Sequence, residues 1–126
     1  MEVLSVLSQY GLQLAHLLIG FFFIFFGFWN VYHWSPIIKT MAERNIPWPF
    51  VVLPLGIACQ TIFGFMILLS FYIKVAALVL IPFTMWAVCV FHPFWKYKGE
   101  LFALNFIVFM TNITVTLGSL LLLVIY

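Results

Sequence analysis

The stretch GLQLAHLLIGFFFIFFGFWNVY, residues 11–32, has no charged side chain in 22 consecutive positions. It belongs to an uncharged run over residues 3–38, and further uncharged runs cover residues 45–73, 75–95 and 101–126. A helix needs about 20 apolar residues to cross a hydrocarbon core about 30 Å thick, so each run is long enough for one crossing. Because the runs are apolar throughout and do not alternate at every second residue, they predict helices rather than barrel strands.

The composition of the whole chain supports the same interpretation. Of 126 residues, 67% are hydrophobic, 21% aromatic and only 6% charged, whereas about 25% of the residues in an average soluble domain are charged. A soluble fold of this size has too little polar surface to cover so many apolar side chains, and a formal net charge of +2 is too small to indicate a nucleic-acid partner. We predict one all-α domain over residues 1–126, an integral membrane four-helix transmembrane bundle in the lipid bilayer. Its spans are expected at about residues 11–32, 50–71, 75–91 and 101–125.

The segments outside the spans predict how the chain is oriented. The first residues are expected to form a short amphipathic entry into a retained first helix, and residues 36–44 a short interfacial helix. Four of the five basic residues lie in the 35–49 and 92–100 loops, and only Lys74 lies on the side of the two termini. Because Lys and Arg are in excess on the cytoplasmic side of membrane proteins, we expect both loops in the cytoplasm and both termini outside.

Polar and small residues recur at helical spacing in every span. Lipid cannot hydrogen-bond their amides, so these stripes are expected to face one another inside the bundle. The four stripes are His16, Gly20, Phe23, Gly27 and Asn30; Gly56, Gln60 and Gly64; Pro82, Trp86, Cys89 and His92; and Asn105, Phe109, Asn112, Thr116 and Ser119. For any single member, helix packing is the ordinary role, and we assign it to His16, Gly20, Gly27, Gly56 and Gly64.

Several of these groups converge toward the cytoplasmic end of the bundle. Such a gathering of amides, an imidazole and aromatic rings predicts a small cavity that opens to that face. The residues expected to bind a ligand there are Asn30, Gln60, Trp86, His92, Asn105, Phe109 and Asn112. Aromatic residues near the loops are better explained as interfacial anchors; they are Tyr32, Trp34, Trp48, Trp95 and Tyr97.

The first stripe also resembles the first-helix signature of the DoxX family. That signature has Arg, Gly, Gly and Lys at the spacing of His16, Gly20, Gly27 and Asn30. Residues 58–64 are similar to the A-x-E-x-x-x-G stretch of the family, and residues 91–95 to its His/Phe-rich segment after the third helix. The resemblance implies a small four-helix protein of the bacterial inner membrane. It also implies an association with quinone-linked or thiosulfate oxidation and with oxidative-stress complexes.

The chain departs from the family at its ionisable positions. His16 stands where the family typically has Arg, Asn30 where it has Lys, and Gln60 where it has Glu. Asn and Gln would keep a hydrogen bond between the latter two positions while removing both charges. Proton coupling through a membrane carboxylate is therefore not expected, which counts against a four-helix drug/proton exchanger.

Other chemistry finds little support in the sequence. Cys59 and Cys89 fall at similar depth in an antiparallel hairpin, which leaves a contact between them open, but the chain has no C-x-x-C redox pair. No cluster of metal ligands, nucleophile triad or phosphate-binding loop is present. We therefore expect no metal and no covalently bound cofactor, although a quinone is a possible ligand.

Two functions remain open. The first is a non-catalytic subunit or binding module that holds a quinone, lipid or other small hydrophobic ligand beside a redox partner. Its neighbours would be subunits of a redox complex or further copies of the chain. The second is an enzyme, a membrane quinone-dependent oxidoreductase in which His92 moves the proton. Because the sequence encodes no electron carrier, we favour the first function.

Overall fold

A computed structural model of the chain describes residues 2–126 and is almost entirely helical. The elements are α1 (Glu2–Tyr32), α2 (Trp34–Glu43), α3 (Pro49–Leu68), α4 (Ile73–Phe91), the 3₁₀-turn η1 (Phe94–Lys96), α5 (Glu100–Thr111), the π-helix η2 (Asn112–Thr116) and α6 (Leu117–Ile125). Within residues 2–126, four segments are long and apolar enough to cross a membrane: Glu2–Tyr32, Pro49–Leu68, Ile73–Lys96 and Glu100–Ile125. The prediction of an all-α, four-helix membrane protein is confirmed.

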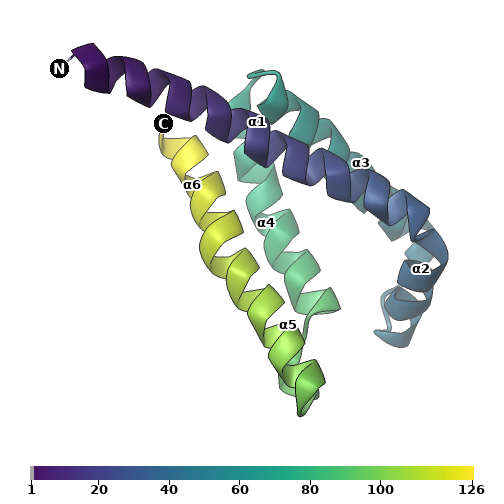
Figure 1. Ribbon diagram of the computed structural model, residues 1–126. Helices are drawn as coiled ribbons and strands as arrows, with labels where there is room; N and C mark the ends of the chain where they lie inside the picture. Colours follow the sequence, from purple (N-terminus) through teal and green to yellow (C-terminus); the bar gives the residue numbers. More distant parts are fainter. Residues whose placement is uncertain (1) are drawn as a thin grey trace.

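The four spans form two pairs that are joined at one end (Figure 1). In the first pair α1 packs along α3, and in the second α4 packs along η2 and α6. A short turn over residues 69–72 connects α3 to α4. From this turn the two pairs diverge, and α2 and the loop after α4 lie at the far end, away from both termini. The bundle is therefore splayed at the end that carries its longer loops.

The first span is longer than the sequence pattern predicts. α1 begins at Glu2 rather than at residue 11, and its 31 residues make a helix of about 46 Å at 1.5 Å per residue, more than the hydrocarbon core requires. The side chains of residues 2–10 are all exposed. The expected amphipathic entry is thus the first part of α1 itself, while the short helix expected over residues 36–44 corresponds to α2.

Glycine allows α1 and α3 to approach to backbone contact. A Cβ atom on Gly20 would stand 2.7 Å from the backbone nitrogen of Leu68 and 2.8 Å from the carbonyl oxygen of Gly64. A Cβ atom on Gly27 would collide with Thr61 Oγ1. The stripes of these two spans therefore face each other, with His16, Gly20, Phe23, Gly27, Gln60 and Gly64 buried.

The inward face of α4 differs from the expectation. Its buried residues are Ala76, Ala77, Leu80, Thr84 and Val88, whereas Pro82, Trp86 and Cys89 are exposed. The small alanines allow the leucine face of α6 to pack closely in a common core, because van der Waals contact drives helix association in lipid. The prediction that this stripe faces inward was wrong for Pro82 and Cys89, whereas the exposed Trp86 borders the space between the two helix pairs.

The fourth span is interrupted where one continuous helix was expected. α5 buries no side chain, the helix widens into η2 at Asn112, and only α6 presents a buried face to α4. The polar stripe expected to face inward here is only half-buried. Asn105 and Asn112 each donate to a carbonyl one turn earlier in the same helix, that of Leu101 at 2.8 Å and that of Val108 at 2.9 Å. One N–H of each amide is therefore bonded within its own helix.

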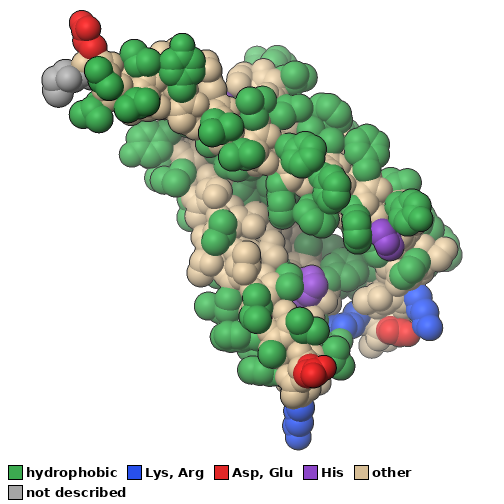
Figure 2. All heavy atoms as spheres, in the orientation of Figure 1, with side chains coloured by type: hydrophobic (Ala, Val, Ile, Leu, Met, Phe, Trp, Pro, Cys, Tyr) green, Lys and Arg blue, Asp and Glu red, His purple; other side chains and the backbone are tan. Residues whose placement is uncertain are grey.

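Apolar side chains cover most of the outer surface. On the face shown in Figure 2, hydrophobic side chains extend over α1 and over the helices of the fourth span, and acidic and basic side chains lie only toward the ends. Large residues such as Leu4, Phe28 and Ile107 are 60–65% exposed. Acyl chains would surround these side chains in a bilayer.

Candidate functional site

A cavity of about 590 Å³ lies between the two helix pairs at the splayed end of the bundle. Residues of α1, α2, α3 and α4 line it, and Val108 and Asn112 contribute from the fourth span. The aromatic part of the wall consists of Phe22, Phe23, Phe26, Trp29, Phe83, Trp86 and Phe91. This volume and this largely apolar wall are typical of sites that bind a small molecule.

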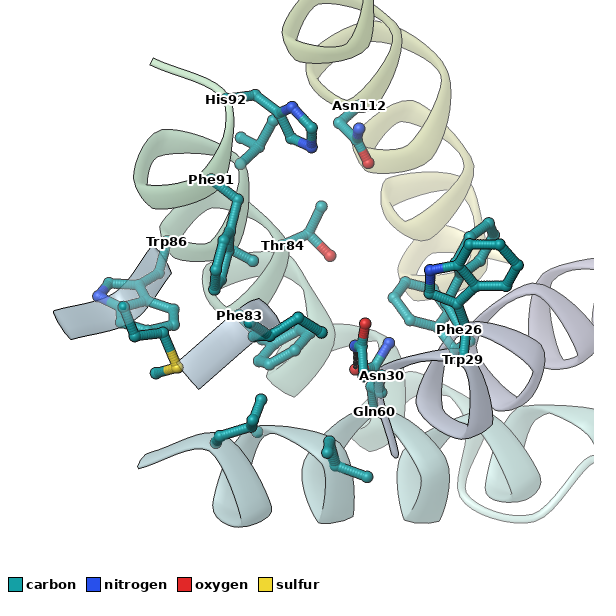
Figure 3. Close-up of a pocket in the computed structure, with 18 of the residues that line it drawn as sticks. Phe26, Trp29, Asn30, Gln60, Phe83, Thr84, Trp86, Phe91, His92 and Asn112 are labelled. Atoms are coloured by element: carbon teal, nitrogen blue, oxygen red, sulfur yellow. Dashed lines mark hydrogen bonds between the residues drawn. The ribbon is translucent and has the colours of Figure 1, made fainter. Parts of the chain in front are cut away.

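A neutral amide pair lies in the wall that α1 and α3 form. Asn30 Nδ2 donates a hydrogen bond to Gln60 Oε1 at 2.8 Å, and Gln60 is buried. Figure 3 shows the two side chains meeting in front of α4. Because one donor and one acceptor are used in this bond, Gln60 Nε2 remains as a donor and Asn30 Oδ1 as an acceptor.

A threonine on α4 brings an unpaired hydroxyl into the same space. Thr84 is 6% exposed, and among residues 2–126 its Oγ1 atom has no hydrogen-bond partner. In Figure 3 the hydroxyl points into the cavity, between His92 and the Asn30–Gln60 pair. Leaving a buried hydroxyl without a partner costs about 1–3 kcal/mol, so a hydrogen bond to this atom would be favourable.

His92 and Asn112 form a second polar group of the cavity. His92 Nδ1 lies 3.1 Å from Asn105 Oδ1, which holds the imidazole ring in place at the end of α4. Asn112 stands at the first residue of η2 and is tied to Val108 through its nitrogen. Figure 3 shows the His92 ring beside the Asn112 amide, with the amide oxygen on the cavity side.

The structure brings five of the seven predicted ligand-binding residues to this cavity. They are Asn30, Gln60, Trp86, His92 and Asn112. Asn105 does not line it and instead lies behind His92 as its hydrogen-bond partner. Phe109 does not line it either, because its ring packs at 5.0 Å on Phe94 and 5.9 Å on Trp95.

Two polar wall residues, Thr40 and Thr84, were not predicted from the sequence, and of these the Thr40 hydroxyl already donates to the Pro36 carbonyl. A signal for Thr84 exists in the row Ala76, Leu80, Thr84 and Val88, which steps by four along one face of α4. A hydroxyl in an otherwise aliphatic row is an ordinary feature of membrane helices. Only its burial without a partner distinguishes it.

The residues predicted to pack the helices lie in three different settings. Gly20, Gly27 and Gly64 are at the α1–α3 contact. Gly56 is half-buried, lines the cavity and faces Phe83 at ordinary contact distance. His16 is buried near the opposite end of the bundle, with Nδ1 3.3 Å from Ser70 Oγ in the turn before α4.

One contact joins the two helix pairs at the splayed end. The Arg44 guanidinium, just after α2, donates a hydrogen bond to the Tyr97 hydroxyl and lies 5.6 Å from the centre of that ring. Three of the aromatic residues that the sequence places at the interface, Tyr32, Trp48 and Trp95, are 54–86% exposed. Within residues 2–126 no three His, Cys, Asp or Glu side chains gather as a metal site, and Cys59 and Cys89 are free thiols.

Comparison with known proteins places this architecture in a family. The model of the family described as DoxX matches residues 11–93, which is about two thirds of the chain. The chain belongs to the DoxX family. Inner membrane protein YphA of Escherichia coli (strain K12) is 25% identical to this DoxX protein over 114 residues, which cover 90% of the chain and 81% of YphA. No solved structure matches the chain.

Two of the residues that carry the family resemblance lie in the wall of the cavity. Asn30 and Gln60 occupy the positions where DoxX proteins typically have Lys and Glu, and here they contact each other. This DoxX protein therefore has a neutral hydrogen-bonded pair in its cavity wall. Asn112, the fourth-span amide in the cavity, lies beyond the matched residues.

Proposed function

We propose that this DoxX-family membrane protein is a non-catalytic binding module of the bacterial inner membrane. It holds a small hydrophobic molecule, such as a quinone or a lipid, in the cavity between its two helix pairs. The observation that carries the proposal is the Thr84 hydroxyl, which is buried, unpaired and directed into an otherwise largely apolar cavity. A ligand with a polar group would supply the missing hydrogen bond, and its apolar body would contact the aromatic wall.

The inner-membrane location is supported by the name of the relative YphA and by the four apolar spans. A binding module without an electron carrier of its own would act beside a redox partner, such as a subunit that carries a flavin, haem or iron–sulfur centre. Subunits of such a complex or further copies of the chain would pack against the exposed apolar faces of the spans.

The contact with Asn105 restricts the alternative, a quinone-dependent oxidoreductase with His92 as proton shuttle, to proton transfer through Nε2. A shuttle must pass its proton onward. His92 Nδ1 contacts an amide oxygen of Asn105, and an amide does not take up a proton near neutral pH. A relay through the Asn105 side chain would therefore end there. Quinone reduction by the purified protein alone would favour the enzyme over the binding module.

The decisive experiment extracts and identifies what the protein holds. The protein is purified gently, and small molecules extracted from it are identified by mass spectrometry. Gln60→Leu and Asn112→Leu are expected to reduce the amount of the bound molecule at unchanged membrane insertion, because each removes an amide from the cavity wall. Gln13→Leu, at an exposed position of α1 outside the cavity, is the matched control and should retain it. Equal retention by all three variants would show that the molecule is bound elsewhere.

A further inference from the structure

The hydrogen bonds around His92 determine which of its ring nitrogens carries the proton. Asn105 Nδ2 donates to the Leu101 carbonyl at 2.8 Å, so the amide oxygen is the atom that faces His92 Nδ1 at 3.1 Å. An amide oxygen only accepts hydrogen bonds, and His92 Nδ1 must therefore be the donor. A neutral ring protonated at Nδ1 has a lone pair on Nε2, and no residue of the described chain is bonded to that nitrogen.

The amide of Asn112, beside His92, also presents a hydrogen-bond acceptor to the cavity. Asn112 Nδ2 is bonded to the Val108 carbonyl at 2.9 Å, and the oxygen of that amide lies on the cavity side (Figure 3). His92 Nε2 and Asn112 Oδ1 are both acceptors, and both residues line the cavity. At this end of the cavity these two acceptors therefore have no donor bonded to them, while the second N–H of the Asn112 amide and the Thr84 hydroxyl can still donate.

The other groups of the cavity wall are polar but neutral, or aromatic. Thr84 Oγ1 can donate or accept, and Gln60 Nε2 is a free donor farther from His92. Among residues 2–126 no charged side chain lines the cavity, and the Arg44 guanidinium outside its wall is bonded to Tyr97, so an ionised ligand would lose its hydration without touching a counter-charge. The aromatic wall suits an apolar ring or chain.

From these groups we infer that the cavity selects a neutral, mostly apolar molecule with a terminal hydroxyl, which donates its hydrogen bond to His92 Nε2 or Asn112 Oδ1. This inference rests on the proposed binding function and specifies its ligand class. A molecule whose polar end is only a carbonyl brings an acceptor to a place that already has two. The hydroxyl oxygen of the selected ligand can in turn accept a hydrogen bond from Thr84.

The test compares two probes that differ in one donor, 4-heptylcyclohexanol and 4-heptylcyclohexanone. Binding to the purified full chain in detergent is measured by calorimetry and by tryptophan fluorescence, since Trp29 and Trp86 line the cavity. Affinities are expressed relative to the mole fraction of each probe in the micelle, which corrects for their different partitioning. The alcohol is expected to bind at least about tenfold more tightly than the ketone, because the ketone would leave both acceptors without a donor.

Variants locate the selective group. His92→Phe removes the Nε2 acceptor and is expected to reduce the alcohol preference to within about twofold of equality, and Asn112→Leu is a second variant if the first does not fold. His33→Phe makes the same change at a histidine that stacks on Trp29 with ring centres 4.3 Å apart but does not line the cavity, and it should keep the preference.

The possible outcomes separate the inference from the function on which it rests. Equal binding of alcohol and ketone to the unmodified protein overturns the hydroxyl selectivity and leaves the binding function standing. A preference that survives both His92→Phe and Asn112→Leu overturns the assignment to these acceptors. Binding of neither probe, together with no small molecule in the mass-spectrometric extract, overturns the binding function itself.

Discussion

Asn30 on α1 and Gln60 on α3 meet as a neutral pair, with Asn30 Nδ2 2.8 Å from Gln60 Oε1 in the wall of the cavity. At these two positions DoxX proteins typically have Lys and Glu. A buried ion pair is tolerated only while both partners are present, and the amide pair keeps the contact without the charges. The polarity of the cavity is thereby lowered while the link between the two helices is preserved.

Charge replacement at this pair tests the contact directly. Asn30→Lys alone would place an unpaired charge among buried groups and is expected to destabilise the protein by about 3–5 kcal/mol, the usual effect of an uncompensated buried charge. Asn30→Lys combined with Gln60→Glu should recover most of this loss. Thermal unfolding in detergent, followed by circular dichroism, is measured for these two variants and for Gln60→Glu alone. If the two single effects simply add in the double variant, the side chains do not interact.

The close approach of α1 and α3 predicts opposite effects of the same substitution at two glycines. Gly20→Ala would put a Cβ 2.7 Å from the Leu68 backbone nitrogen and should lower the unfolding midpoint, because neither backbone can move without separating the helices. Gly11→Ala is the control, since nothing lies within 4 Å of its Cβ position. There the higher helix propensity of alanine should leave the stability unchanged or raise it by up to about 1 kcal/mol. A Gly20→Ala protein as stable as the Gly11→Ala protein would contradict the backbone contact.

The sequence predicts the α1–α3 contact well and the interior of α4 poorly, for a physical reason. Gly20, Gln60 and Gly64 are small or polar residues in an apolar background, and their spacing marks a helix face. The buried row of α4 consists of Ala, Leu and Val apart from Thr84, and lipid-facing rows have the same composition. In a membrane, hydrophobicity does not distinguish inside from outside. Packing volume decides instead, and it becomes visible only in three dimensions.

The sequence likewise does not predict which residues of the fourth span line the cavity. A uniform period of 3.6 residues places Asn105, Phe109 and Asn112 on one stripe, but the helix widens into a π-helix at Asn112. π-segments of this kind are frequent at functional sites. Asn112 lines the cavity, whereas His92 covers Asn105 and Phe94 covers Phe109, contacts with the loop after α4 that helical spacing does not show.

Phe94 is expected to hold the loop after α4 against α5. Its ring lies at 5.0–5.8 Å from those of four other aromatic residues, which are Trp95, Phe102, Phe106 and Phe109. Phe94→Ala removes these contacts and should destabilise the protein by about 3–5 kcal/mol, the usual range for a well-packed ring. Phe28→Ala, at a side chain that is 61% exposed, should change the unfolding midpoint little in the same detergent. Equal effects of the two substitutions would contradict the role of the cluster.

The orientation of the chain can be tested by thiol labelling. In a background with Cys59→Ser and Cys89→Ser, single cysteines are introduced as Lys98→Cys in the loop after α4 and as Tyr126→Cys at the last residue. Because basic residues are concentrated in the loops opposite the termini, a membrane-impermeant maleimide should label only Tyr126→Cys in intact spheroplasts. Lys98→Cys should react after the membrane is permeabilised. The reverse pattern would mean that the termini are cytoplasmic and that the cavity opens to the outside.

Thr84→Val should separate the stability of the empty protein from its binding. Valine has nearly the shape of threonine, and the change removes a buried hydroxyl that has no partner among residues 2–126. Because the penalty for that unpaired group disappears, the ligand-free protein should become more stable, by about 1–3 kcal/mol.

The same change deletes the hydrogen bond that a bound hydroxyl would accept, so the affinity for 4-heptylcyclohexanol should fall several-fold. Unfolding midpoints of the variant are therefore measured with and without this alcohol, and the stabilisation that the alcohol produces should shrink as the midpoint of the empty protein rises. A lower midpoint in the absence of ligand would show that Thr84 already has a partner in the folded protein, and an unchanged affinity would place the bound molecule away from this hydroxyl.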